Sequence, residues 1–219
     1  MTTPLDGPRR KPLSGGPPTA LVVLLHGLGG DGAALIELAG PLGAALPDLA
    51  FAAPNGPEPC DMAPFGYQWF SLQDRDPQRL ARDADAAAGP LAGFVEAELA
   101  ALRLGATRLA LVGFSQGTMM ALHLGLRMAP APAAIVGFSG LLLAPGRLAA
   151  EKRGAPPVLL IHGMADDIVP FARMAAAEAE LAAAGIPVET LARPDLPHGI
   201  DGPGVAAAIR FLKRHLGQG

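Results

Sequence analysis

Short apolar runs alternate with longer helix-favouring segments along most of the chain. The apolar runs have the length and composition of strands that are buried on both faces, and they lie at Ala20–Leu25, Leu49–Ala53, Arg108–Gly113, Ala133–Phe138, Val158–Ile161 and Val188–Leu191. Between the runs, Ala-rich segments predict helices over 33–46, 78–103 with a break near Gly89-Pro90, 116–129, 171–184 and 204–216. Repeated strand-then-helix order predicts an α/β fold, with a mostly parallel central sheet and helices on both faces.

The chain of 219 residues has the length of one domain, which we expect to span residues 19–219. Residues 1–18 are rich in Pro and Gly and lack periodicity, so we expect a loose N-terminal arm, with a short edge strand as the alternative. Residues 54–76 are unusually long for a structureless connection, and such loops are commonly functional. This loop is predicted to form one wall of a site.

One serine lies in a pattern typical of nucleophiles. Residues 113–117 match G-x-S-x-G, with Ser115 at the centre, between a predicted strand and a predicted helix. Such a turn lifts the hydroxyl above the sheet edge, and the flanking glycines remove side chains that would collide with strand and helix. We therefore expect Ser115 to be the nucleophile. Ser139 has a similar setting but is followed by Leu141 where the pattern requires Gly, so it is expected to line a pocket or a turn.

A serine hydroxyl needs an adjacent base, and histidine, with an ordinary pKa of ~6.5, suits this task. His123 lies on the same predicted helix as Ser115 and about 12 Å further along its axis, which is too far. His198 lies in the loop between the last strand and the last helix, at the sheet edge where open α/β sheets place their sites. His198 is the predicted general base, and His162, at the end of a strand, is the alternative.

The carboxylate that orients the base should follow a strand and precede the histidine in the chain. Asp166 and Asp167 both meet this condition. Either could instead cap the following helix, and spacing does not choose between them.

The glycine-rich turn at 27–32 allows two interpretations. It matches G-x-G-x-x-G after a strand, which is the dinucleotide-binding fingerprint. That fingerprint requires an acidic residue at the end of the next strand, where residues 51–54 supply none. In a serine hydrolase the same turn contributes a backbone N–H to the oxyanion hole, together with the residue after the nucleophile, so Leu28 and Gln116 are the predicted donors. A non-catalytic ligand binder of the same fold is a further alternative.

Composition narrows the function classes. The formal net charge of −3 offers nucleic acid no broad basic face. Five histidines and the lone Cys60 form no metal-ligand or disulfide pattern, so no metal is expected. The first residues lack the apolar run of a signal peptide, and no apolar stretch reaches the ~20 residues that cross a bilayer. We expect a soluble, cytoplasmic protein without stable membrane insertion.

Several motifs in order resemble those of one family, the bacterial carboxylesterases related to acyl-protein thioesterases and lysophospholipases. The resemblance spans about residues 20–216 and is carried by Leu24, His26-Gly27-Leu28-Gly29, Trp69-Phe70, Gly113–Gly117, Gly137–Gly140, His162-Gly163, Asp166, Val169-Pro170 and His198-Gly199-Ile200. It implies an α/β-hydrolase fold without a large cap domain. Two positions depart from the family pattern: Ser71 replaces the Asp that usually follows Trp-Phe, and Thr118 replaces a second Gly.

The resemblance also implies roles for individual residues. It selects Asp166 over Asp167 as the triad acid, because the family acid lies four residues after the His of His-Gly. It implies an oxyanion hole at Leu28 and Gln116, and an acyl pocket bordered by Trp69, Phe70 and Phe138, to which we add Leu141.

The expected activity is hydrolysis of a small-molecule carboxylic ester through an acyl-enzyme, without a cofactor. Thioesters, acylated proteins and lysolipids are the alternative substrates. The short connection between Ser139 and Val158 leaves no room for a cap, so we expect an open cleft that favours short or surface-presented acyl groups. A homodimer is expected by analogy alone.

Overall fold

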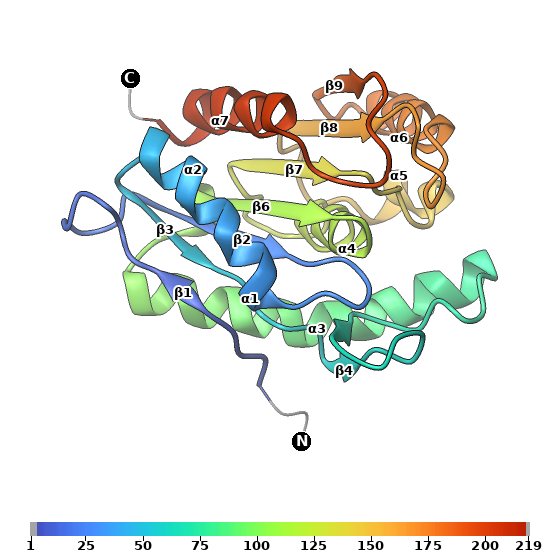
Figure 1. Ribbon diagram of the computed structural model, residues 1–219, viewed down its shortest axis with the longest axis horizontal. Coiled ribbons are helices and arrows are strands. Elements are labelled where there is room, and N and C mark those ends of the chain that lie inside the picture. Colours follow the sequence, from blue (N-terminus) through green and yellow to red (C-terminus); the bar gives the residue numbers. More distant parts are fainter. Residues whose placement is uncertain (1–3, 218–219) are drawn as a thin grey trace.

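The computed structural model describes residues 4–217 and is built around a seven-stranded sheet (Figure 1). The strand order is β1-β3-β2-β6-β7-β8-β9, and a separate ribbon pairs β4 with β5. The strands are β1 (Arg9–Arg10), β2 (Ala20–Leu25), β3 (Leu49–Ala52), β4 (Glu58–Pro59), β5 (Tyr67–Gln68), β6 (Leu109–Phe114), β7 (Ala134–Phe138), β8 (Val158–Gly163) and β9 (Val188–Arg193). All neighbours in the large sheet are parallel except β1, which runs antiparallel to β3 at the edge.

Helices cover both faces of this sheet, and the expected α/β-hydrolase fold is confirmed. The helices are α1 (Gly32–Leu35), α2 (Ala39–Ala45), α3 (Pro77–Leu102), α4 (Gln116–Gly125), α5 (Leu148–Glu151), α6 (Ala172–Ala183) and α7 (Gly202–Leu216), with short 3₁₀ turns η1 (Ile36–Leu38), η2 (Ala106–Arg108) and η3 (Pro145–Arg147). Only η3 and α5 interrupt the connection between β7 and β8, so no large cap domain is present there.

Two apolar cores lie on opposite faces of the sheet because successive strand residues point to opposite sides. In β2, Leu21 and Val23 face the core shared with α3, α4 and α6, whereas Val22 and Leu24 face the core shared with α2 and α7. Parallel strands covered in this way must be apolar at every position, as the buried run of β2 is. The apolar runs are therefore a reliable guide to these strands, whose bounds differ from the predicted ones by at most two residues.

The predicted break at Gly89-Pro90 is wrong, because α3 continues through both residues. Pro90 lacks the N–H that would bond to the carbonyl of Ala86, but Ala86 is exposed and water can satisfy that oxygen. Buried residues on either side, Ala87 and Leu91, keep the same helix face against the core. Packing of this face outweighs the local cost of the proline.

The N-terminal segment reaches the sheet edge, where Arg9–Arg10 form β1. The division of the chain into an N-terminal arm and a domain stays a prediction. Residues 1–3 and 218–219 lie outside the described part of the chain. Within residues 4–217, no helix is both long enough and apolar enough to cross a bilayer.

Candidate active site

Ser115 lies at the junction of β6 and α4 in a strained backbone conformation. Its φ of 53° and ψ of −116° are rarely adopted by a residue with a side chain, and its N–H donates to the carbonyl of Phe138 at 2.8 Å. A Cβ at Gly117 would overlap the Leu25 carbonyl oxygen, and one at Gly113 would overlap the backbone of Gly117. The two glycines therefore permit the close approach of strand and helix that raises Ser115 at the sheet edge.

Three hydrogen bonds hold the buried carboxylate of Asp166. Oδ1 accepts from the amides of Ile168 at 3.0 Å and Val169 at 2.8 Å, and Oδ2 lies 2.8 Å from Nδ1 of His198 and 3.2 Å from Nε2 of His162. Burial alone would raise the pKa of Asp166, but the hydrogen bonds from His198 and the two amides outweigh burial and lower it. The carboxylate is thus kept ionised against His198.

The alternative residues lie elsewhere. Asp167 is exposed, and His162 is buried behind Asp166 with its Nε2 donating to the Val169 carbonyl at 2.8 Å. His123 is buried between α4 and α3, where its Nε2 lies 2.9 Å from Oδ1 of Asp85. Among the histidines of residues 4–217, only His198 borders the same large cavity as Ser115.

This cavity has a volume of about 620 Å³ and opens above the carboxyl edge of the sheet. Ser115 and His198 border it, and most of its remaining lining is apolar, with charged groups supplied by Arg75, Arg173 and Glu180. A volume of several hundred cubic ångströms and an apolar lining with few polar groups are typical of small-molecule sites. The 54–76 loop contributes Leu72 and Arg75, so part of it forms a wall, as predicted.

The predicted oxyanion-hole residues, Leu28 and Gln116, lie in different segments of the chain. Leu28 borders the cavity, and Gln116 is the first residue of α4. Neither amide donates a hydrogen bond to another group within residues 4–217. The side chain of Gln116 is engaged elsewhere: Oε1 accepts from the Trp69 amide at 3.0 Å, and Nε2 donates to the Phe70 carbonyl at 2.6 Å.

The predicted aromatic pocket residues are not at the cavity wall. Trp69, Phe70 and Phe138 are buried in the core. Trp69 stacks on His26 at a ring distance of 5.3 Å and donates from Nε1 to the His26 carbonyl, which braces the glycine-rich turn. Of the four residues expected to border the acyl pocket, Leu141 borders the cavity.

The two departures from the family pattern have distinct surroundings. Thr118 Oγ1 lies 2.8 Å from both the Gly113 and Phe138 carbonyls, so the extra hydroxyl links β6 to β7 directly beside Ser115. Ser71 has a local role, since its Oγ accepts from the Gln73 amide at 3.2 Å. Ser139, also at positive φ, donates to the carbonyl of Gly199 and so contacts the loop that carries His198.

Most of the cavity wall lies outside the residues predicted from the sequence to form the site. Residues 141–145 line it consecutively, and Ile168, Val169 and Pro170 line it beside Asp166. The run Leu141-Leu142-Leu143 outside any predicted strand was the available signal. Among the described residues, no group of three or more His, Cys, Asp or Glu side chains is arranged to hold a metal ion.

Comparison with known proteins identifies the family of this chain. The family model described as phospholipase/carboxylesterase matches residues 13–216. The chain belongs to the phospholipase/carboxylesterase family. Membership confirms the expected resemblance and the class of enzyme, an esterase-type hydrolase, and it argues against the dinucleotide-binding interpretation of the 27–32 turn.

Members of the phospholipase/carboxylesterase family with curated names include esterase YpfH of Escherichia coli, 30% identical over 198 residues that cover 90% of this chain and 83% of the relative. Acyl-protein thioesterase 1 of Schizosaccharomyces pombe is 30% identical over 213 residues, covering 91% of this chain and 92% of the relative. Among solved structures, esterase PE8 superposes with a TM-score of 0.92 at 41% identity, covering 98% of this chain and 100% of PE8.

Proposed function

We propose that this protein is a serine carboxylesterase in which Ser115 attacks the ester carbonyl, His198 is the general base and Asp166 orients His198. The observation that carries the proposal is the pairing of a strained serine at the β6–α4 junction with a histidine whose Nδ1 bonds to a buried carboxylate, both bordering one cavity. A histidine whose Nδ1–H donates to Asp166 has its Nε2 lone pair available for a proton.

The proposed reaction has two halves. His198 Nε2 accepts the Ser115 Oγ proton as Oγ bonds to the carbonyl carbon, and His198 then protonates the leaving alcohol as the acyl-enzyme forms. Water, deprotonated by His198, attacks the acyl-enzyme, and Ser115 recovers its proton as the carboxylic acid leaves. The unpartnered amides of Leu28 and Gln116 support their proposed role as oxyanion donors, each worth about 3 kcal/mol of barrier.

The proposed substrates are carboxylic esters whose acyl group enters the apolar cavity. The 620 Å³ volume favours longer acyl groups than the open, short-chain cleft expected from sequence. The name of the yeast relative, acyl-protein thioesterase 1, supports thioesters as a second substrate type, since the same acyl-enzyme serves both. Lysolipid substrates, a cytoplasmic location and a homodimer stay predictions.

A fluorophosphonate probe with peptide mapping tests the nucleophile. We expect labelling at Ser115 in the wild type, none in Ser115→Ala, and a loss of about 10⁴-fold or more in kcat on p-nitrophenyl butyrate in that variant. Ser139→Ala is the matched control, because Ser139 also lies at positive φ after the neighbouring strand, and it should keep the label. An adduct on any residue other than Ser115 would refute the assignment.

A further inference from the structure

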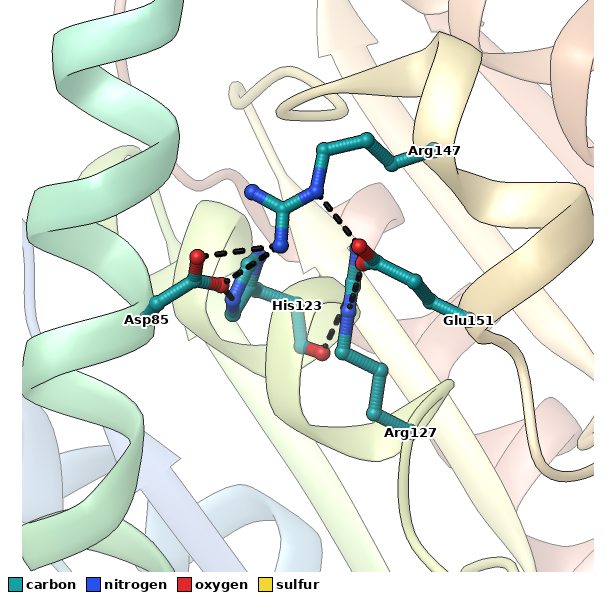
Figure 2. Close-up of polar contacts among 5 residues, drawn as sticks. All are labelled: Asp85, His123, Arg127, Arg147 and Glu151. Carbon is teal, nitrogen blue, oxygen red and sulfur yellow. Dashed lines mark hydrogen bonds and ion pairs between the residues drawn. The ribbon is translucent and has the colours of Figure 1, made fainter.

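Five polar residues, none of which lines the cavity beside Ser115 and His198, form a closed network (Figure 2). Arg147 lies at its centre: Nη2 donates to both oxygens of Asp85, at 3.2 and 3.0 Å, and Nε donates to Oε1 of Glu151 at 2.5 Å. Arg127 donates to Oε2 of Glu151 from Nε at 2.9 Å and from Nη2 at 2.7 Å. His123 completes the circuit, with Nε2 at 2.9 Å from Asp85 and its carbonyl accepting from Arg127 at 2.9 Å.

The charges of this network balance when His123 is neutral. Burial, and then the nearby charge of Arg127, lower the pKa of His123 below its ordinary value. Its Nδ1 is buried and has no hydrogen-bond partner within residues 4–217, so a proton there would lack an acceptor. Two carboxylates and two guanidinium groups then compensate each other, and the network can persist in a partly buried position.

The network joins three elements that also line the cavity. Asp85 lies on α3, whose first turns contribute Pro77 and Leu80 to the lining. His123 lies on α4, one turn beyond the lining residue Met119. Arg147 lies two residues after the last residue of the lining segment 141–145. One cluster of ion pairs thus connects the helix walls to the loop wall.

The loop wall has a conformation that needs restraint. Ala144 adopts a left-handed backbone, with φ of 45° and ψ of 52°, which is unfavourable for any residue with a Cβ. The N–H of Arg147 donates to the Ala144 carbonyl at 3.0 Å, so the residue that anchors the network also closes the strained turn.

We infer that this network determines acyl-chain selectivity, with Arg147 as the principal positioning residue: by bonding to Asp85 and Glu151 it holds the 141–145 wall against the acyl group. The inference rests on the proposed function, since it assigns the cavity beside Ser115 to the acyl chain. Short acyl groups fill little of the cavity and make few contacts with this wall, whereas longer groups pack along it. Loss of the network therefore penalises long chains selectively.

The test compares wild type, Arg147→Ala and Arg147→Lys on p-nitrophenyl acetate, butyrate and octanoate. In Arg147→Ala, we expect kcat/KM on acetate to stay within about twofold of the wild-type value. The ratio of kcat/KM on octanoate to kcat/KM on acetate should fall about tenfold, which corresponds to the loss of contact with roughly two methylene groups. Arg147→Lys should recover part of the ratio, since it keeps the charge but not the fork of donors. Arg214→Ala is the control, because it breaks an exposed ion pair with Glu189, and neither residue lines the cavity.

Hydrogen exchange gives a readout that does not require activity. Amides of 141–147 should exchange faster in Arg147→Ala than in wild type or Arg214→Ala. An unchanged chain-length profile, an equal loss on all three esters, or a wild type inactive on chains longer than acetate would overturn the inference. If no ester is cleaved and Ser115 takes no label, the proposed function fails instead. Faster exchange of the 141–147 amides in Arg147→Ala would in that case still show that the network restrains the wall.

Discussion

At the residue scale, the site depends on a few positions where the backbone tolerates only one arrangement. Ser115 keeps a positive φ although it has a side chain, and this strain persists because the Phe138 carbonyl and the packed glycines leave no alternative. The G-x-S-x-G pattern predicted this junction because its requirement is local: a small residue must lie where strand and helix nearly touch. By contrast, no local signal indicated that Thr118 would bond beside Ser115, since its acceptor on Phe138 lies on another strand.

Gly117→Ala tests the close approach directly. An added Cβ would overlap the Leu25 carbonyl oxygen, which is backbone and has little freedom to move, so we expect a destabilisation of about 3 kcal/mol or more. Urea unfolding measures the change. Gly40→Ala is the control, because a Cβ there meets no atom within 4 Å, and it should leave stability unchanged or slightly raised. Equal stability of the two variants would contradict the proposed contact.

At the element scale, α3 shows how tertiary packing overrides local preference. Gly89-Pro90 predicted a break, yet the helix runs unbroken from Asp76, whose side chain caps it, to Arg103, because its apolar face is buried on both sides of the proline. The low helix propensity of proline and glycine can be read from the sequence. The burial of the apolar face of α3, which outweighs that low propensity, depends on tertiary contacts that the sequence does not show. The same limitation hid the 141–145 wall, whose position depends on contacts to α3 and α4.

Gly89→Ala should stabilise the protein by about 0.5–1 kcal/mol. Gly89 lies inside α3, and a Cβ added there would meet no atom within 4 Å, so alanine reduces the flexibility of the unfolded chain without a clash. Thermal unfolding should give a higher midpoint with an unchanged rate of ester hydrolysis. A lower midpoint would mean that the helix needs glycine flexibility beside Pro90.

At the scale of the whole molecule, burial of titratable groups couples folding to pH. Burial lowers the pKa of His26 and of His123 below the ordinary value of 6.5. The unfolded chain therefore takes up protons below about pH 6.5 that the folded protein does not, and stability rises with pH through this window. Asp166 also makes the folded protein more stable as pH rises. Its pKa is lowered in the folded protein, so its contribution to stability is present above its ordinary pKa of 3.8 and is lost as pH falls below that value.

We expect the free energy of unfolding to decrease from pH 7 to pH 5, by up to about 1.4 kcal/mol per pH unit for each of the two buried histidines. Urea unfolding at several pH values measures this slope. His123→Gln should make the slope shallower, because it removes one of the groups whose pKa burial lowers in the folded protein. A slope that is flat in wild type, or unchanged in the variant, would contradict the burial argument.

The sequence by itself determined the features that depend on neighbours along the chain: the apolar strands, the helices between them, the glycine-flanked junction at Ser115 and the order of the motifs that indicate the family. Such features follow from side-chain periodicity and backbone sterics, which act over a few residues. Spacing left Asp166 and Asp167 as alternatives and the family resemblance selected Asp166, but only the tertiary structure shows Asp166 in contact with His198. Only the tertiary structure decided that Trp69 packs on His26 instead of bordering the cavity. It also decided that Arg147 joins Asp85 on α3, because contacts between residues far apart in sequence depend on how the whole sheet and its helices pack.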